Sequence, residues 1–445
     1  MSEVVVVRGR LVQAAAVVDD GVVVASGGRV AFAGGVADAV AAGFGADVDR
    51  VPAAPGAYLL PGLVDLHNHG GGGASFPDVT SAAQALPGVL EHRRHGTTTL
   101  LASLVTARPE VLLERAAVLA ELVESGEIEG LHAEGPFLSH RRRGAHNPAD
   151  LQEGSVELVR DLARAARGSL RTMTVAPEVP GVSGPSGVAE VLVEAGVLPS
   201  LGHTDGSTEQ AEALIEQVGA ALRRRNGAAA RVLGPMTATH LFNGMRPLHH
   251  RAPGPIAACL AAAARGDMVV ELIGDGVHLD PATVRSVFDM VGADAVVLVT
   301  DAMAAAGVAD GRYELGPMSV RVHEGVARIV PAPGAPGAED EGAIAGGTAH
   351  LVDVVRGAVR GGVPLVDAVR SATAVPARVL GLTGEVGALV PGARADVLVT
   401  DADLRPVRVL RQGADVEGVG TADGTGAAAG GAGRTGVVDA DVAGA

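Results

Sequence analysis

The sequence contains no lysine, so all 35 of its basic residues are arginines. This absence excludes a Schiff-base lysine, a P-loop lysine that binds nucleotide phosphates, and a carboxylated lysine that bridges two metal ions. Tryptophan is also absent, and aromatic residues make up only 2% of the chain. Because 47% of the residues are hydrophobic, a substantial core is still expected, built mainly from valine, leucine and alanine.

Cysteine is nearly absent as well. Cys259 is the only one, so no internal disulfide can form, which fits a reducing cytoplasm. Its alanine-rich surroundings predict a buried helix and an inert thiol. The apolar run at the N-terminus is too short for a signal peptide, and no stretch approaches the ~18 apolar residues of a membrane helix. We therefore expect a cytoplasmic protein without a membrane partner.

The formal net charge at pH 7 is −16. Such an acidic chain is not expected to bind nucleic acid. An anionic substrate would need local positive charge from a few arginines or histidines.

The middle of the chain alternates between strand-like and helix-like segments. Eight strands separated by helices favour a parallel (β/α)₈ barrel over an open sheet. The strand-like runs are residues 61–67, 98–104, 128–134, 171–176, 198–202, 236–240, 269–274 and 296–301. The helix-like segments include residues 108–125, 151–167, 207–222, 280–291, 348–360 and 365–380.

Both ends of the chain read as short strands with tight turns. Residues 1–60 and 391–413 are predicted to build one small β-sandwich, with the catalytic barrel of residues 61–390 inserted between them. A β-hairpin is predicted within residues 312–330. Residues 414–445 are mostly Gly, Ala, Asp and Thr and cannot bury a core, which predicts a disordered, non-catalytic tail.

Metal-type residues stand where several of the predicted strands end. His67 and His69 close the run PGLVDLHNH, and residues i and i+2 of a strand point to the same face. Two histidines at this spacing are by themselves weak evidence for a metal site, because they could equally form a hydrogen-bonded pair without a metal. In a barrel, however, the carboxyl ends of the strands converge on one mouth. The further residues of this kind are Glu134, His203, His240 and Asp301.

Seven motifs together give the chain a family resemblance. They are PGLVDLHNH (61–69), HAEGPFL (132–138), RGAHNP (143–148), GHT (202–204), THLFNGM (239–245), GDGVHL (274–279) and VTDAM (299–303). The set resembles the amidohydrolase superfamily and, within it, the N-acetylglucosamine-6-phosphate deacetylases, over residues 1–413. The missing lysine agrees, because this group has a glutamate, here Glu134, where many relatives have a carboxylated lysine.

The resemblance implies a metal-dependent hydrolase. Glu134, His203 and His240 would hold one divalent ion, Zn²⁺ or Fe²⁺. His67 and His69 are both retained, so a second ion is plausible, giving one or two per subunit. Asp301 would act as general base and acid, taking a proton from the activated water and passing it to the leaving amine.

The resemblance also implies where an amino-sugar phosphate would bind. Arg251 would reach the phosphate from the neighbouring subunit of a homodimer, and a guanidinium fork suits phosphate geometry. The other implied substrate contacts are Ala145, His146, Asn243, Gly244, His278, Ile344, Ala345 and Gly346. The chain departs from the family pattern at His250, where glycine is usual, and at Gly244, where alanine is frequent, so the phosphate pocket could be retuned.

The implied reaction is hydrolysis of the acetamide of N-acetyl-D-glucosamine 6-phosphate to D-glucosamine 6-phosphate and acetate, in amino-sugar catabolism and cell-wall recycling. The galactosamine isomer is an open alternative, because one hydroxyl separates the two substrates. An inactive scaffold is another, although retention of the catalytic set argues against it. A deaminase or a cyclic-imide hydrolase would need a signature or a lysine that the chain lacks.

The remaining histidines receive simpler interpretations. His132 shares a strand face with Glu134 and is expected to support the metal site rather than bind the ion. His92 and His95 are predicted on a surface helix, and His323 and His350 are predicted to be solvated.

Overall fold

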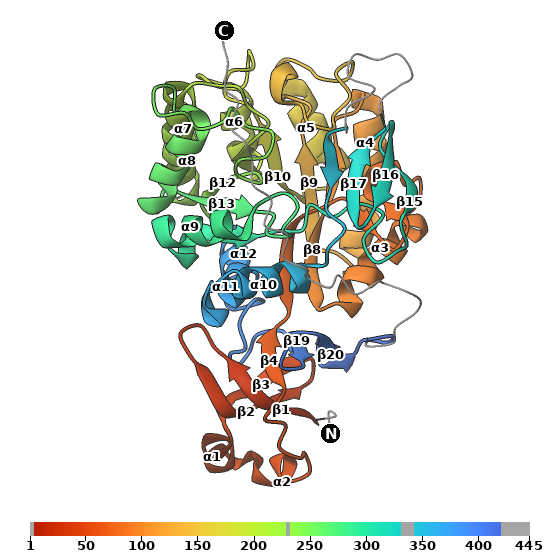
Figure 1. Ribbon diagram of the computed structural model, residues 1–445, viewed down its shortest axis with the longest axis vertical. Coiled ribbons are helices and arrows are strands. Elements are labelled where there is room, and N and C mark those ends of the chain that lie inside the picture. The colour runs from red at the N-terminus through yellow and green to blue at the C-terminus, as the bar shows by residue number, and fades with distance from the viewer. Residues whose placement is uncertain (1–3, 228–231, 331–341, 420–445) are drawn as a thin grey trace, which may run out of the picture.

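Eight parallel strands form the barrel at the centre of the molecule (Figure 1), a computed structural model that describes residues 4–227, 232–330 and 342–419. Each begins within two residues of the start of a predicted run, so the barrel prediction is confirmed. The sheet closes where Asn68 bridges Ala302 and the Asp301 N–H donates to the His67 carbonyl at 2.9 Å. In sheet order the strands are β14 (Val296–Leu298), β13 (Met268–Leu272), β12 (Met236–Ala238), β11 (Leu198–Leu201), β10 (Leu170–Val175), β9 (Gly130–Glu134), β8 (Thr97–Val105) and β5 (Leu63–Asn68).

Helices surround the barrel strands (Figure 1). Two predicted helices differ from the structure. The helix predicted from residue 151 begins at 156, because the Ser155 side chain caps it, and the helix predicted over 365–380 breaks at Thr373. The helices are α3 (Ala82–Arg94), α4 (Pro109–Glu124), α5 (Val156–Ala165), α6 (Val188–Glu194), α7 (Thr208–Asn226), α8 (Gly254–Ala264), α9 (Pro281–Val291), α10 (Leu351–Arg360), α11 (Leu365–Ser371) and α12 (Ala374–Val379).

Strands from both ends of the chain build the small β domain, as predicted, and it lies at one end of the barrel (Figure 1). They form one hydrogen-bonded sheet of seven strands. Residues from both ends of the chain, such as Val7, Val23 and Val397, pack together in one hydrophobic core of this domain. Strand β21 lies inside the segment predicted to be a disordered tail, and residues 420–445 of that segment lie outside the described residues. In sheet order the strands are β21 (Ala414–Asp415), β20 (Pro406–Arg411), β19 (Val397–Thr400), β4 (Tyr58–Pro61), β1 (Val4–Val12), β2 (Val17–Ser26) and β3 (Arg29–Gly35).

A four-stranded antiparallel sheet stands beside β8 and β9 (Figure 1). The predicted hairpin is part of it, with a turn at Glu324 and Gly325, but two further strands join. Leu315 and Val320 of this sheet share a small apolar core with Val105 of β8. The strands are β15 (Gly311–Leu315), β16 (Met318–His323), β17 (Val326–Ile329) and β18 (Ile344–Gly346).

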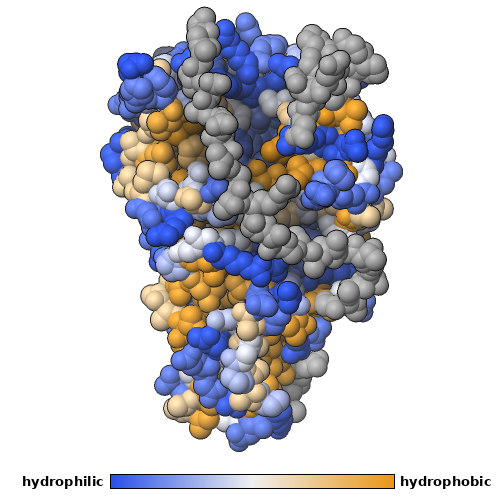
Figure 2. Space-filling view, viewed as in Figure 1, coloured by the Kyte–Doolittle hydropathy of each residue, from blue (hydrophilic) through white to orange (hydrophobic). Residues whose placement is uncertain are grey.

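The surface is mixed in character. Figure 2 shows polar residues interspersed with apolar patches on both the barrel and the small domain. Within the described ranges, no helix is both long enough and apolar enough to span a membrane. Cys259 is fully buried, and burial raises the pKa of its thiol to about 12, so it is the inert core residue that the sequence predicts.

Candidate active site

The carboxylate of Glu134 lies at the centre of the barrel mouth. Its Oε1 is 2.9 Å from Nε2 of His203 and 2.8 Å from Nε2 of His240. Its Oε2 is 3.2 Å from Nε2 of His69. Strands β9, β11, β12 and β5 therefore bring one carboxylate and three imidazoles from distant parts of the sequence into contact, all of them buried.

His67, His69 and Asp301 form an adjoining group. The Nε2 atoms of the two histidines are 3.0 Å apart, and Oδ1 of Asp301 is 3.4 Å and 3.3 Å from them. Imidazole and carboxylate are the donors that Zn²⁺ and Fe²⁺ accept, and donors about 3 Å apart can share an ion at bonds of about 2.0–2.2 Å. The residues therefore fit one or two divalent ions.

The electrostatics of the site favour positive charge. Burial disfavours the charged form of His67, yet the charges of Asp301 and Glu134 outweigh burial and raise its pKa well above the usual value. Burial would likewise raise the pKa of Asp301, but the charge of His67 and a hydrogen bond from His69 lower it. Two ionised carboxylates thus draw a cation into a buried space, as a metal site requires.

Hydrogen bonds to the far nitrogens fix how the histidines face the site. Nδ1 of His203 donates to the Arg142 carbonyl at 2.7 Å, which leaves the Nε2 lone pair free for a metal. His146 has the opposite arrangement, because its Nδ1 accepts from the Thr106 N–H at 3.3 Å. Its Nε2 must therefore carry the proton, which makes His146 a hydrogen-bond donor rather than a ligand.

Three of these residues have unusual backbone conformations. His203, His240 and Asp301 have φ values of 47°, 31° and 48°, in the left-handed region that non-glycine residues rarely adopt. Each costs on the order of 1–3 kcal/mol, and such residues cluster at functional sites. The sequence gives no sign of this strain, because none of the three is a glycine.

The structure adds one supporting residue that the motifs do not identify, Glu271. Oε2 of Glu271 accepts from the His240 N–H at 3.4 Å and lies 3.5 Å from Nδ1 of His67. The sequence signal that could have identified Glu271 is its position as an acidic residue inside the apolar run MVVEL. His132 touches two hydroxyls, Ser103 Oγ at Nδ1 and Thr174 Oγ1 at Nε2, both at 2.9 Å. It therefore lies beneath the site as support, as predicted.

A cavity of about 240 Å³ opens above these groups. Arg251 does not line it: the residue lies on an exposed loop, with Nη1 2.9 Å from Nε2 of His250. The predicted site residues that do line the cavity are His69, Glu134, Ala145, His146, His203, His240, Asn243, Gly244, His278, Asp301, Ile344, Ala345 and Gly346.

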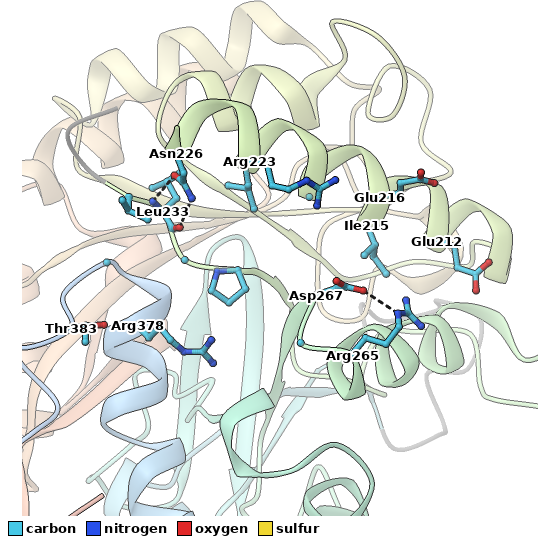
Figure 3. A pocket seen from close by; sticks show the side chains of 17 residues that line it. Glu212, Ile215, Glu216, Arg223, Asn226, Leu233, Arg265, Asp267, Arg378 and Thr383 are labelled. Carbon is cyan, nitrogen blue, oxygen red and sulfur yellow. Dashed lines mark hydrogen bonds and ion pairs between the residues drawn. The ribbon is translucent and has the colours of Figure 1, made fainter. Parts of the chain in front are cut away.

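A larger cavity, about 1320 Å³, lies elsewhere (Figure 3). Its lining includes residues just before β12 and β13, so it opens at the amino end of the barrel, away from the convergent donors. Its charged side chains include the Arg265–Asp267 ion pair, at 3.0 Å. None of its described lining residues is a histidine, and we assign the chemistry to the smaller cavity.

Two predictions about histidines are wrong. His92 and His350 were expected at the surface, but they are 0% and 8% exposed. Nε2 of His92 donates to the Gly70 carbonyl at 2.9 Å, and Nε2 of His350 lies 2.9 Å from Oε1 of Glu91. Tertiary packing between α3 and α10 buries both rings, which a helical pattern with few apolar residues does not reveal.

Comparisons with known proteins agree with this fold. Residues 58–426 match the model of the Amidohydrolase family. The N-acetylgalactosamine-6-phosphate deacetylase of Escherichia coli O157:H7 is 31% identical over 361 residues, which cover 80% of this chain and 86% of that protein. The N-acetylglucosamine-6-phosphate deacetylase of Lysinibacillus sphaericus is 30% identical over 366 residues, which cover 80% and 85%. A mutant N-acetyl-D-glucosamine-6-phosphate deacetylase from Mycobacterium smegmatis, solved in complex with N-acetyl-D-glucosamine-6-phosphate, superimposes with a TM-score of 0.78 at 36% identity, covering 93% of this chain and 99% of that one.

Proposed function

The chain belongs to the amidohydrolase family, and we propose that it hydrolyses the acetamide of N-acetyl-D-glucosamine 6-phosphate to D-glucosamine 6-phosphate and acetate. The observation that carries this proposal is the convergence of Glu134 on three imidazole Nε2 atoms beside an ionised Asp301, at the floor of a small cavity. The named relatives supply the substrate class.

We assign one divalent ion to Glu134, His203 and His240. Where a second ion is bound, we assign it to His67 and His69. When bound, the ion supplies Lewis-acid polarisation of the acetamide carbonyl and lowers the pKa of water in the site. Zn²⁺ and Fe²⁺ both suit these donors.

Asp301 moves the proton in this reaction. Its carboxylate is ionised, so it can accept a proton from the attacking water and then deliver it to the leaving amine. Its backbone is held on both sides: the Asp301 N–H donates to the His67 carbonyl at 2.9 Å, and the Gly347 N–H donates to the Asp301 carbonyl at 2.6 Å. The carboxylate is thereby fixed between β14 and β5.

His146 orients the substrate from the side of the cavity. Its Nε2 carries the proton and lies 3.4 Å from Oε2 of Glu134, so it can donate a hydrogen bond to an oxygen of the sugar or its acetyl group when substrate fills the cavity. Leu315, Met318 and Ile344, from the four-stranded sheet, line the same cavity. Their apolar surfaces limit access of water to the reacting amide.

The phosphate end is assigned to Asn243, Gly244 and His278, together with Arg251 of a second subunit. Burial would lower the pKa of His278, but the hydrogen bond to Asp275, at 2.8 Å, raises it, which favours the cationic form that suits a phosphate. Arg251 is exposed and absent from the cavity lining of its own subunit, as a residue that acts across an interface would be.

Exposed apolar side chains support a homodimer on this side. Leu248 and Val277 are 50% and 41% exposed, and they lie on the loops that follow the neighbouring strands β12 and β13. A partner subunit that covers these loops would bury both residues. We further assign the enzyme to the cytoplasm, because its one cysteine is a buried free thiol.

The galactosamine isomer is a second candidate substrate, because one relative carries that name. Acetate release should be measured with both sugar phosphates on one sample, together with its metal content. We expect turnover of the glucosamine derivative that depends on bound metal. A preference for the galactosamine derivative would reassign the substrate, and no turnover of either by the metal-loaded protein would contradict the proposal.

A further inference from the structure

The backbone carbonyl that orients the imidazole of His203 lies on a short turn outside the barrel strands. Residues His140–Arg142 form this turn of 3₁₀ helix in the loop that follows β9. Nδ1 of His203 donates to the Arg142 carbonyl at 2.7 Å, and the Ser139 N–H donates to the His203 carbonyl at 2.9 Å. The direction of the imidazole therefore depends on where this turn is held.

An ion pair holds the turn in place. Nε of Arg142 donates to Oδ1 of Asp205 at 2.8 Å. The side chains are 33% and 11% exposed, so solvent screens this pair less than it screens a fully exposed one. Asp205 follows His203 by two residues. The end of one strand, β11, thus supplies both the imidazole that meets the Arg142 carbonyl and the carboxylate that meets the Arg142 guanidinium.

Other hydrogen bonds fix the chain at Asp205 itself. Glu178 accepts from the Asp205 N–H at 2.7 Å and from the Thr204 hydroxyl at 2.6 Å. The Thr204 N–H donates to the Gly244 carbonyl at 3.0 Å. None of these bonds uses the Asp205 carboxylate, so a change confined to that carboxylate leaves the end of β11 held.

We propose that Asp205 is a positioning residue that orients the metal ligand His203 through Arg142. This inference rests on the proposed metal site. The carboxylate fixes the Arg142 side chain, and the fixed turn presents its carbonyl to Nδ1 of His203. The Nε2 lone pair of His203 is thereby aimed at the position of the ion. Neither Asp205 nor Arg142 belongs to the described lining of the substrate cavity, so we assign neither a contact with the substrate.

Two further arginines meet the other carboxylate oxygen of Asp205. Nη1 of Arg141 lies 3.3 Å and Nη2 of Arg246 lies 3.4 Å from Oδ2. The Arg141 side chain is 81% exposed, so solvent weakens its contact. Arg246 belongs to the loop that follows β12 and does not contact the turn through this bond. Arg142 is the arginine whose own carbonyl accepts from His203, and we assign the effect of Asp205 to it.

Retention of zinc by the Zn²⁺-loaded full-length protein tests the proposal. Each protein is titrated with a chelator, and the Zn²⁺ that remains is counted per subunit and fitted with one or two ions. Loss of a group that orients a metal-binding histidine typically weakens metal binding about tenfold to a hundredfold. We expect Asp205→Ala to bind one ion about tenfold more weakly than the wild type, the lower end of that range, because Asp205 acts through Arg142.

Arg142→Ala gives a second measurement, which also serves if Asp205→Ala fails to fold. This variant removes the guanidinium and keeps the backbone carbonyl, so it should weaken the same ion by the same factor. The double variant Asp205→Ala/Arg142→Ala should be no weaker than either single variant, because both act through one contact. Arg142→Lys keeps a positive charge opposite Asp205 and should recover most of the affinity. Additive losses without this recovery would mean that Asp205 only supports the fold.

Arg143→Ala is the matched control, because the Arg143 guanidinium bonds to the His140 carbonyl, at 3.0 Å, and not to Asp205. It should retain Zn²⁺ as the wild type does. Wild-type retention by Arg142→Ala, or a loss caused by Arg246→Ala in its place, would overturn the proposal. A wild type that binds no Zn²⁺ would overturn the metal assignment as well. Failure of the proposed reaction is seen separately, as a wild type that binds Zn²⁺ without turning over either sugar phosphate.

Discussion

Asp301 is the residue to which we assign proton transfer, and Asp301→Asn removes that capacity while keeping the size of the side chain. Proton transfer by a positioned carboxylate is typically worth about 10² to 10⁴ in rate. We expect kcat to fall within that range, with KM changed much less, because substrate binding uses other groups. Steady-state kinetics at neutral pH, with metal content verified, gives the measurement. A near-normal kcat would show that another group is the base.

His92 makes the stability of the protein depend on pH. Burial lowers its pKa from 6.5 to about 3, so the folded state keeps it neutral where the unfolded chain binds a proton. The free energy of unfolding should therefore fall as pH drops below 6.5, by at most about 1.4 kcal/mol per pH unit from this group. Its contribution is present above pH 6.5 and is lost toward pH 3.

The variant His92→Gln tests this, because glutamine can still donate to the Gly70 carbonyl but does not titrate. Between pH 6.5 and 5, the wild type should lose about 2 kcal/mol more than the variant in urea unfolding. The exposed His323→Gln variant should follow the wild type. Parallel curves for wild type and His92→Gln would mean that His92 is not held neutral by the fold.

At the scale of the elements, the end of β11 shows how closely the barrel strands pack beneath the site. Gly202 precedes His203, and a Cβ at Gly202 would lie 2.7 Å from Cβ of Thr239 and 2.8 Å from Cγ2 of Thr174. Neither neighbour can move freely, because both threonine hydroxyls belong to the buried network below the site, 2.8 Å apart. Only glycine fits at this strand end.

Gly202→Ala should therefore destabilise the fold by about 1–3 kcal/mol, the usual cost of overpacking. It should also weaken metal binding, because β11 presents His203. Urea unfolding and metal content give the two readouts. Gly56→Ala is the matched control, since a Cβ there meets no atom within 4 Å and should leave both unchanged. Equal stability of the two variants would show that the end of β11 can shift to accommodate the added methyl group.

At the scale of the whole molecule, Arg251 tests the proposed dimer. Loss of a charge-assisted hydrogen bond costs roughly 1.5–3 kcal/mol, or about tenfold to a hundredfold in kcat/KM. Arg251→Ala should lose this much on the 6-phosphate substrate and very little on unphosphorylated N-acetylglucosamine. Equal losses on both substrates would make Arg251 a structural residue.

Mixed dimers then show which subunit supplies the arginine. If Arg251 acts across the interface, a subunit carrying Arg251→Ala can be completed by a partner carrying Asp301→Asn. Each such mixed dimer contains one site with both residues intact, so part of the wild-type activity should return. No recovery in verified mixed dimers would show that each subunit completes its own pocket.

The sequence alone determined much of this protein. The alternation of apolar runs and helical segments predicted all eight barrel strands, because strand and helix periods are local properties of the chain. The convergence of ligand-type residues was also predictable: residues such as His69 and Glu134 each end an apolar run, and parallel strands bring such ends together. The family resemblance implied Glu134 as a ligand, and the absence of lysine agrees with it.

The tertiary structure decided what local patterns do not encode. The left-handed backbone of His203, the burial of His92 and the contact of Glu271 with His67 each depend on segments far apart in the chain. The same holds for Glu91 and His350, which are 259 positions apart in the sequence, although Oε1 of Glu91 lies 2.9 Å from Nε2 of His350. The sequence pattern of one segment determines on which face of a helix or strand a side chain lies. Its charged and hydrogen-bonding partners come from other segments, so they are determined only when the segments pack together.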